Sequence, residues 1–213
     1  MNVTYFRWAR CAIISIFFVS VLPLSTQASE RANSADIQTL VQKLQKGGYV
    51  IYIRHATTDH NKVDQDGTNL KDCATQRNLS ENGRQQARAI GTAISALNIP
   101  IGKVTSSPYC RCIDTATLAF GKAEISPDLA FSITKDEDDT KRLGESLQRM
   151  LATAPAANTN NVIVAHTSNL KTAAGIWPKP EGVAVIFEPL EGQRFFHIGK
   201  IGPDEWSELL TTQ

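Results

Sequence analysis

The residues best suited to chemistry in this chain are an arginine and a histidine that directly follow an apolar run. Residues 49–53, Tyr-Val-Ile-Tyr-Ile, are typical of a buried strand, and Arg54 and His55 stand at its carboxyl end. A neutral imidazole is a nucleophile, and a guanidinium offers paired donors that match phosphate oxygens. The pair therefore suggests attack on phosphorus, although in isolation Arg54 can equally pair with a surface carboxylate while His55 merely ends the strand.

Two further strands lead to residues of the same kind. A short strand expected at 101–106 is followed by Arg111, and the apolar stretch 161–165 is followed directly by His166. Open α/β sheets place their ligand sites at the carboxyl ends of their strands, so one sheet can bring these side chains to one crevice. We therefore expect Arg54, His55, Arg111 and His166 to share a phosphate site.

The elements that must position these residues alternate between helix and strand. Apolar spacing and capping residues predict helices over 34–47, 80–97, 110–120, 143–151 and 203–210. Three additional strands are expected at 123–126, 182–188 and 194–201. Alternating strands and helices predict an α/β fold, specifically a three-layer α/β/α sandwich with a mostly parallel central sheet.

The start of the chain has the pattern of a secretory signal peptide. Arg7 and Arg10 precede the apolar run 11–22, and small residues lead to Ala28. The run is shorter than the roughly 20 residues of a spanning helix, which disfavours the alternative of a retained anchor. The sequence thus predicts a signal peptide at 1–28, a single domain at 29–213, a periplasmic or secreted protein, and no stable membrane insertion after leader removal.

The charge balance excludes a generally basic surface. The chain has 22 basic and 21 acidic side chains, and removing Arg7 and Arg10 leaves 20 against 21, a formal charge of −1 with neutral histidines. A nucleic-acid partner is therefore not expected.

Three cysteines remain after the leader: Cys73, Cys110 and Cys112. In an oxidising compartment they suggest one disulfide and one free thiol. Cys73 pairs with Cys110 or with Cys112, because cysteines one residue apart rarely close a bridge. Such a bridge would tie the loop after His55 to the segment that carries Arg111. The cysteines lack the spacing of a zinc site, so neither a metal nor another cofactor is expected.

Four motifs in this order resemble the histidine phosphatase superfamily, in its phosphoglycerate mutase-like branch and as an exported member. The variant Arg54-His55-Ala56 is similar to the family's Arg-His-Gly signature. The other three are residues 77–87 (Arg-Asn-Leu-Ser-Glu-Asn-Gly-Arg-Gln-Gln-Ala), residues 106–116 (Ser-Ser-Pro-Tyr-Cys-Arg-Cys-Ile-Asp-Thr-Ala) and residues 162–166 (Val-Ile-Val-Ala-His).

The resemblance implies roles for individual residues. His55 would attack phosphorus in line and form a phosphohistidine, while Arg54, Arg111 and His166 hold the phosphate oxygens. Asn61 and, more weakly, Thr58 stand at spacings where many members place phosphate ligands. Water would then release the phosphate without a metal ion.

The proton donor for the leaving oxygen stays open. Glu181 and the acidic run from Asp136 to Asp139 are the candidates, but Glu181 also fits a turn and the run also fits a solvated helix start. Val183 stands where relatives can carry an acid, which leaves room for an enzyme limited to substrates with good leaving groups.

These observations predict an exported, metal-independent phosphomonoesterase that acts through a phosphohistidine. Its partner would be a phosphorylated small molecule or an envelope glycan, for example a cell-envelope phosphosugar. Two alternatives stay open. A noncatalytic phosphate or phosphosugar binding protein would keep the pocket and leave His55 idle, and a phosphomutase would return the phosphoryl group to another oxygen.

Overall fold

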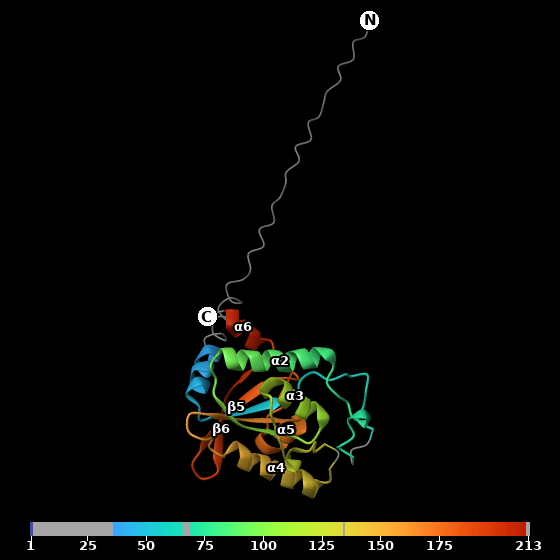
Figure 1. Cartoon of the computed structure of the whole chain (residues 1–213), viewed down its shortest axis with the longest axis vertical. Coiled ribbons are helices and arrows are strands. Elements are labelled where there is room, and N and C mark those ends of the chain that lie inside the picture. The colour runs from blue at the N-terminus through green and yellow to red at the C-terminus, as the bar shows by residue number, and fades with distance from the viewer. Residues whose placement is uncertain (2–35, 66–68, 134, 212–213) are drawn as a thin grey trace.

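Figure 1 shows a computed structural model of the chain, which describes residues 1, 36–65, 69–133 and 135–211. Apart from Met1, the predicted signal peptide lies outside these residues, so its cleavage stays a prediction. Among the described residues, no helix is both long and apolar enough to cross a membrane.

The centre of the fold is a six-stranded sheet with the order β3-β2-β4-β1-β5-β6. β1 is parallel to β4, β4 to β2 and β2 to β3, whereas β5 runs antiparallel to β1 and to β6. The strands are β1 (Val50–Arg54), β2 (Ile101–Ser106), β3 (Glu124–Ile125), β4 (Asn160–Ala165), β5 (Ala184–Leu190) and β6 (Arg194–Ile201). The predicted mostly parallel sheet is confirmed.

Helices cover both faces of this sheet, with α2 and α6 on one side and α4 on the other in Figure 1. The helices are one over residues 36–46, α2 (Glu81–Ala96), α3 (Cys110–Phe120), α4 (Glu137–Leu151), α5 (Thr167–Ala174) and α6 (Glu205–Thr211). Two short 3₁₀ helices, η1 (Cys73–Thr75) and η2 (Pro127–Leu129), lie in the loops. The three-layer α/β/α architecture is therefore confirmed.

Alternation along β1 builds both cores. Ile51 and Ile53 pack in the core formed with helix 36–46, α2, α3 and α6. Val50 and Tyr52 point to the opposite face and pack in the core formed with α4 and α5. Because all four side chains are fully buried, the position of β1 is fixed from both sides.

The strand register explains why the predicted residues meet. Arg54 pairs with Ala165 at the end of β4, and Ser106 at the end of β2 pairs with Val164. The three neighbouring strands therefore end at one level, and the residues that follow each strand lie along one edge of the sheet.

Candidate active site

His55 is buried, with 3% of its surface exposed, and its ring is oriented by the main chain. Nδ1 lies 2.9 Å from the carbonyl oxygen of Ala56, which can only accept, so Nδ1 carries the proton. Burial lowers the pKa of His55 to about 3, and repulsion from nearby arginines, chiefly Arg111 and Arg54, adds to this effect. At neutral pH the ring is uncharged and its Nε2 lone pair is available for attack.

His166 stands immediately before α5, with its ring centroid 5.4 Å from that of His55. The hydroxyl of Tyr52 donates to the carbonyl oxygen of His166 (2.6 Å). Nε2 of His166 lies 2.8 Å from the hydroxyl oxygen of Ser107. Burial, reinforced by the charge of Arg111, lowers the pKa of His166 well below its ordinary value. Two uncharged imidazoles thus lie side by side at the sheet edge.

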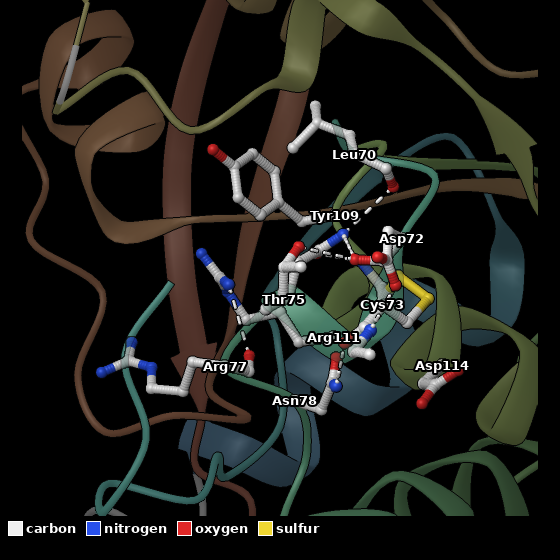
Figure 2. Close-up of a disulfide and its surroundings, with 12 residues drawn as sticks. Leu70, Asp72, Cys73, Thr75, Arg77, Asn78, Tyr109, Arg111 and Asp114 are labelled. Carbon is white, nitrogen blue, oxygen red and sulfur yellow. Dashed lines mark hydrogen bonds between the residues drawn. A yellow bond between two sulfur atoms is a disulfide. The ribbon is translucent and has the colours of Figure 1, made fainter. Parts of the chain in front are cut away.

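Arg111 is almost fully buried in the first turn of α3. Its guanidinium lies over the ring of Tyr109, 4.6 Å from the centroid, and near Phe131. Nη1 donates to Asp64 Oδ1 (2.9 Å) and to the carbonyl oxygen of Arg77 (3.3 Å; Figure 2). The stacking and the ion pair hold this long side chain in one orientation.

Arg54 is held by Glu181, whose Oε1 accepts from Nη2 at 3.1 Å. The same carboxylate accepts from the amide and the hydroxyl of Thr58 and from Nε2 of His60, each at 3.1 Å. Glu181 therefore anchors both Arg54 and the segment after β1. A carboxylate with four donors is suited to orienting its neighbours and poorly placed to deliver a proton.

A cavity of about 170 Å³ collects these side chains. It contains Arg77, a residue of the second motif to which the sequence analysis gave no role. In the described part of the chain, the buried Nε atoms of Arg54, Arg77 and Arg111 have no hydrogen-bond partner. The cavity is lined by Arg54, His55, Arg77, Arg111, Phe131, Ile133, His166, Thr167, Ser168, Trp177 and Lys179.

A disulfide joins Cys73 to Cys110, which is one of the two predicted pairings (Figure 2). It ties the loop that carries Arg77 to the first residue of α3, next to Arg111. Asp64 strengthens the same junction, because its carboxylate accepts from the amide of Arg77 (2.9 Å) as well as from Arg111. The loop and the helix are thus fixed to each other at the cavity wall.

The remaining cysteine, Cys112, is free and buried. Burial raises the pKa of its thiol to about 12, and its Sγ lies 3.5 Å from Nε2 of His166. The protonated thiol packs against the histidine and is not a nucleophile at neutral pH.

Residues of the second motif (77–87) contact the main chain just after His55. The carbonyl oxygen of Thr57 accepts from the amide of Ser80 (3.0 Å), and the amide of Thr57 donates to Gln86 Oε1 (3.0 Å). A Cβ at Gly83 would lie 1.8 Å from that carbonyl oxygen, so a larger residue does not fit. Together these residues fix the main chain beside His55.

The structure does not bring Asn61 into the cavity. Asn61 is exposed, and its amide donates to the side chain of Asp59 (3.1 Å) in a surface turn. Thr58 is buried against Glu181 and is also absent from the cavity lining. The spacing of these two residues from His55 therefore does not translate into contact with the cavity, because the loop turns away after residue 58.

The acidic run begins α4, as its solvated alternative predicted. Asp136 caps the helix by accepting from the amide of Asp139, and Asp139 pairs with Arg142. Neither this run nor Glu181 lines the cavity, and the lining residues include no carboxylate. No group of three or more His, Cys, Asp or Glu side chains is placed to hold a metal ion in the chain as described.

Comparison with known proteins agrees with this arrangement. Residues 50–132 match the family model described as the histidine phosphatase superfamily (branch 1). This segment contains Arg54, His55, Arg77 and Arg111, whereas His166 lies beyond it. A search of curated proteins finds no match.

Three solved structures share the fold. The protein histidine phosphatase SixA with tungstate has a TM-score of 0.51 at 14% identity, covering 73% of this chain and 97% of that chain. Phosphoserine phosphatase of Entamoeba histolytica with 3-phosphoglyceric acid has a TM-score of 0.51 at 15% identity, covering 72% of this chain and 96% of that chain. Mycobacterial glucosyl-3-phosphoglycerate phosphatase with VO3 has a TM-score of 0.52 at 15% identity, covering 71% of this chain and 97% of that chain.

The protein has an α/β fold that these solved structures share. Its residues 50–132 match the model of the histidine phosphatase superfamily, so the resemblance predicted from the four motifs is confirmed over this segment, while export stays a prediction.

Proposed function

We propose that this protein is a metal-independent phosphomonoesterase in which His55 forms a phosphohistidine. The observation that carries the proposal is the set of three guanidinium side chains, those of Arg54, Arg77 and Arg111, that line one cavity with an uncharged, oriented His55. Guanidinium groups bind phosphate oxygens through charge-assisted hydrogen bonds, and three in one cavity fit an oxyanion ligand.

The charge of the cavity supports a phosphomonoester. Glu181 neutralises Arg54 and Asp64 neutralises Arg111, whereas no carboxylate of the described residues forms an ion pair with Arg77 or Lys179. With both histidines neutral, two positive charges remain. A phosphomonoester carries a charge of roughly −1.5 to −2 at pH 7, so ligand and cavity are matched.

The reaction would proceed in two in-line steps. Nε2 of His55 attacks phosphorus while the ester oxygen leaves with its electron pair, and water later attacks the phosphohistidine to release phosphate. Arg54, Arg77 and Arg111 would stabilise the charge on the equatorial oxygens, which is the main source of catalysis in phosphoryl transfer. Nδ1 of His55 keeps its proton throughout because it donates a hydrogen bond to the carbonyl oxygen of Ala56.

No carboxylate among the lining residues can protonate the leaving oxygen. We therefore assign this proton to solvent water at the cavity mouth. The assignment favours esters with good leaving groups, since their oxygen needs little protonation in the transition state.

Export forms part of the proposal. We infer cleavage after Ala28, which leaves a single domain at 29–213 in the periplasm or secreted medium. The Cys73–Cys110 disulfide supports an oxidising compartment. A phosphorylated small molecule or a cell-envelope phosphosugar is the proposed substrate, and amino-terminal sequencing of the exported protein tests the cleavage site.

The central test is hydrolysis of p-nitrophenyl phosphate in the presence of EDTA by the wild type and by His55→Ala. We expect turnover in the wild type, its loss in the variant, and a trapped phosphohistidine at His55 after rapid acid quenching. His197→Ala is the matched control, since His197 lies on β6 away from the cavity. Phosphate binding without turnover or trapping would instead identify a noncatalytic binding protein.

A further inference from the structure

Two exposed apolar side chains line the mouth of the cavity. Ile133 is 64% exposed and Trp177 is 51% exposed, whereas His55, Arg111 and His166 are nearly fully buried. The cavity therefore has a charged floor and an apolar rim. Because both side chains line the same cavity as the buried arginines and histidines, they lie where a ligand bound at the floor would leave the cavity.

The cavity is too small for a whole substrate. Its volume of about 170 Å³ lies below the roughly 300–1,000 Å³ of common small-molecule sites. The phosphoryl group and the atoms bonded to it fill such a space. The alcohol part of a phosphomonoester must then extend outward, and the side chains it meets there are Ile133, Trp177 and Lys179.

Lys179 supports the face of the indole. Its Nζ lies over the ring of Trp177, 5.7 Å from the centroid, which is within the range of a cation–π contact. The ring of Trp177 is thereby restrained although half of it is exposed. A restrained, exposed aromatic face suits stacking against another flat surface.

We propose that Trp177 and Ile133 form a leaving-group subsite, and that the substrate is the phosphate ester of a cyclic alcohol whose flat apolar face stacks on Trp177. This inference rests on the proposed phosphatase function. A pyranose ring and an aryl ring both present such a face, whereas a short linear alcohol does not. Charge selects the phosphate at the floor, and ring stacking selects the ester at the rim.

The test compares Trp177→Ala and Trp177→Phe with the wild type on three esters: p-nitrophenyl phosphate, glucose 6-phosphate and glycerol 3-phosphate. We expect Trp177→Ala to lower kcat/KM about tenfold for the two cyclic esters and less than twofold for glycerol 3-phosphate. Trp177→Phe should restore most of the loss because a phenyl ring also stacks. A fall for glucose 6-phosphate shows that a pyranose uses the subsite as an aryl ring does.

Phe196→Ala is the matched control, since Phe196 is 62% exposed on β6 and does not line the cavity. It should alter none of the three rates. An equal loss on all esters in Trp177→Ala, or no loss on any, would overturn the subsite and leave the phosphatase proposal standing.

Fluorescence separates the subsite from catalysis. The protein without residues 1–28 lacks Trp8, and its tryptophans are Trp177 and Trp206. Trp206 is fully buried, so quenching of the exposed Trp177 by p-nitrophenyl phosphate reports ligand at the rim. If the wild type hydrolyses no ester, saturable quenching that inorganic phosphate competes and that Trp177→Phe abolishes would still uphold the subsite while refuting turnover. Absence of both turnover and quenching would refute the two proposals together.

Discussion

The floor and the wall of the cavity are held in place by different means. The floor consists of Arg54, His55 and His166, which follow two paired central strands, so the sheet itself sets their positions. The wall consists of Arg77 on a loop and Arg111 on α3, and a disulfide and Asp64 join these two segments. Residues at strand ends inherit their geometry from the core, whereas residues on loops need ties of their own.

This difference has an energetic consequence. The floor shares the cooperative stability of the sheet, so displacing it requires disruption of β1 or β4. The wall depends on one covalent bond and a few polar contacts, which single substitutions can remove. The floor and the wall should therefore respond to different perturbations.

After the loss of turnover expected for His55→Ala, the largest effect is expected at the floor, from Arg54→Ala. We expect kcat/KM to fall roughly a hundredfold, since a charged hydrogen bond to phosphate contributes roughly 1.5 to 3 kcal/mol and the cavity also loses a positive charge. The free energy of unfolding should fall by roughly 3 kcal/mol because the buried Glu181 loses its cation. Enzyme kinetics and urea unfolding measure the two effects.

A second variant separates these two roles of Arg54. In Arg54→Ala/Glu181→Gln the buried carboxylate is replaced by a neutral amide, so much of the lost stability should return while turnover stays low. Recovery of turnover together with stability would mean that Arg54 serves only the fold, and the floor would then lose its assigned phosphate contact.

At the wall, Arg77→Ala should have a smaller and purely functional effect. Arg77 has no ion-pair partner among the described residues, so its removal leaves no buried carboxylate without a cation. We expect roughly a tenfold fall in kcat/KM, from the loss of one charged hydrogen bond, and an unchanged melting temperature. The matched control is Arg88→Ala, an exposed position on α2. Equal rates for both variants would exclude Arg77 from the phosphate site.

Removing the disulfide should loosen the wall without disturbing the floor. In Cys73→Ser/Cys110→Ser we expect KM to rise a fewfold with little change in kcat, because Arg77 and Arg111 keep only Asp64 as a common anchor while His55 keeps its place. Removing this cross-link between two residues 37 positions apart should also lower the free energy of unfolding by roughly 2 to 4 kcal/mol. Kinetics with and without a thiol reductant measure the effect.

The double variant provides its own control in this experiment. Reductant should shift the wild type toward the KM of the variant and leave the variant unchanged. A fall in kcat with constant KM would contradict the separation of wall and floor.

The same contrast explains what the sequence could predict. Arg54, His55 and His166 follow apolar runs whose burial the pattern reveals, and Arg111 follows a strand in a recognisable motif. Arg77 opens another motif, but its approach to the cavity depends on Asp64 and the disulfide, and loop residues without periodicity do not predict such contacts. The helix α5 after His166 was likewise not predicted, because its eight residues are too few to show a helical period.

Two candidates lie outside the cavity lining for the same reason. Asn61 was assigned from its spacing to His55, yet the chain between them leaves the sheet and turns at Asp59. Glu181 was considered as a proton donor, yet its partner Thr58 is 123 residues away in sequence. Spacing predicts position along a strand or helix, where the backbone is regular, and loses this power in loops.

The smallest expected effect is a difference between floor and wall in how the free energy of unfolding depends on pH. The pKa of His55 lies at about 3 in the fold against 6.5 ordinarily, and the pKa of His166 is lowered too. Between these pH values the unfolded chain binds protons that the folded chain does not, so stability falls as pH drops from 6.5 toward 3. Urea unfolding at pH 7 and pH 4.5 should show this loss in the wild type and a smaller one in His55→Ala. Arg77→Ala should retain most of the loss, since the wall contributes no histidine and burial is the main cause of both lowered pKa values, with the charge of Arg77 a lesser one. An equal pH dependence in all three proteins would show that His55 is protonated in the fold and that the floor does not hold a neutral nucleophile.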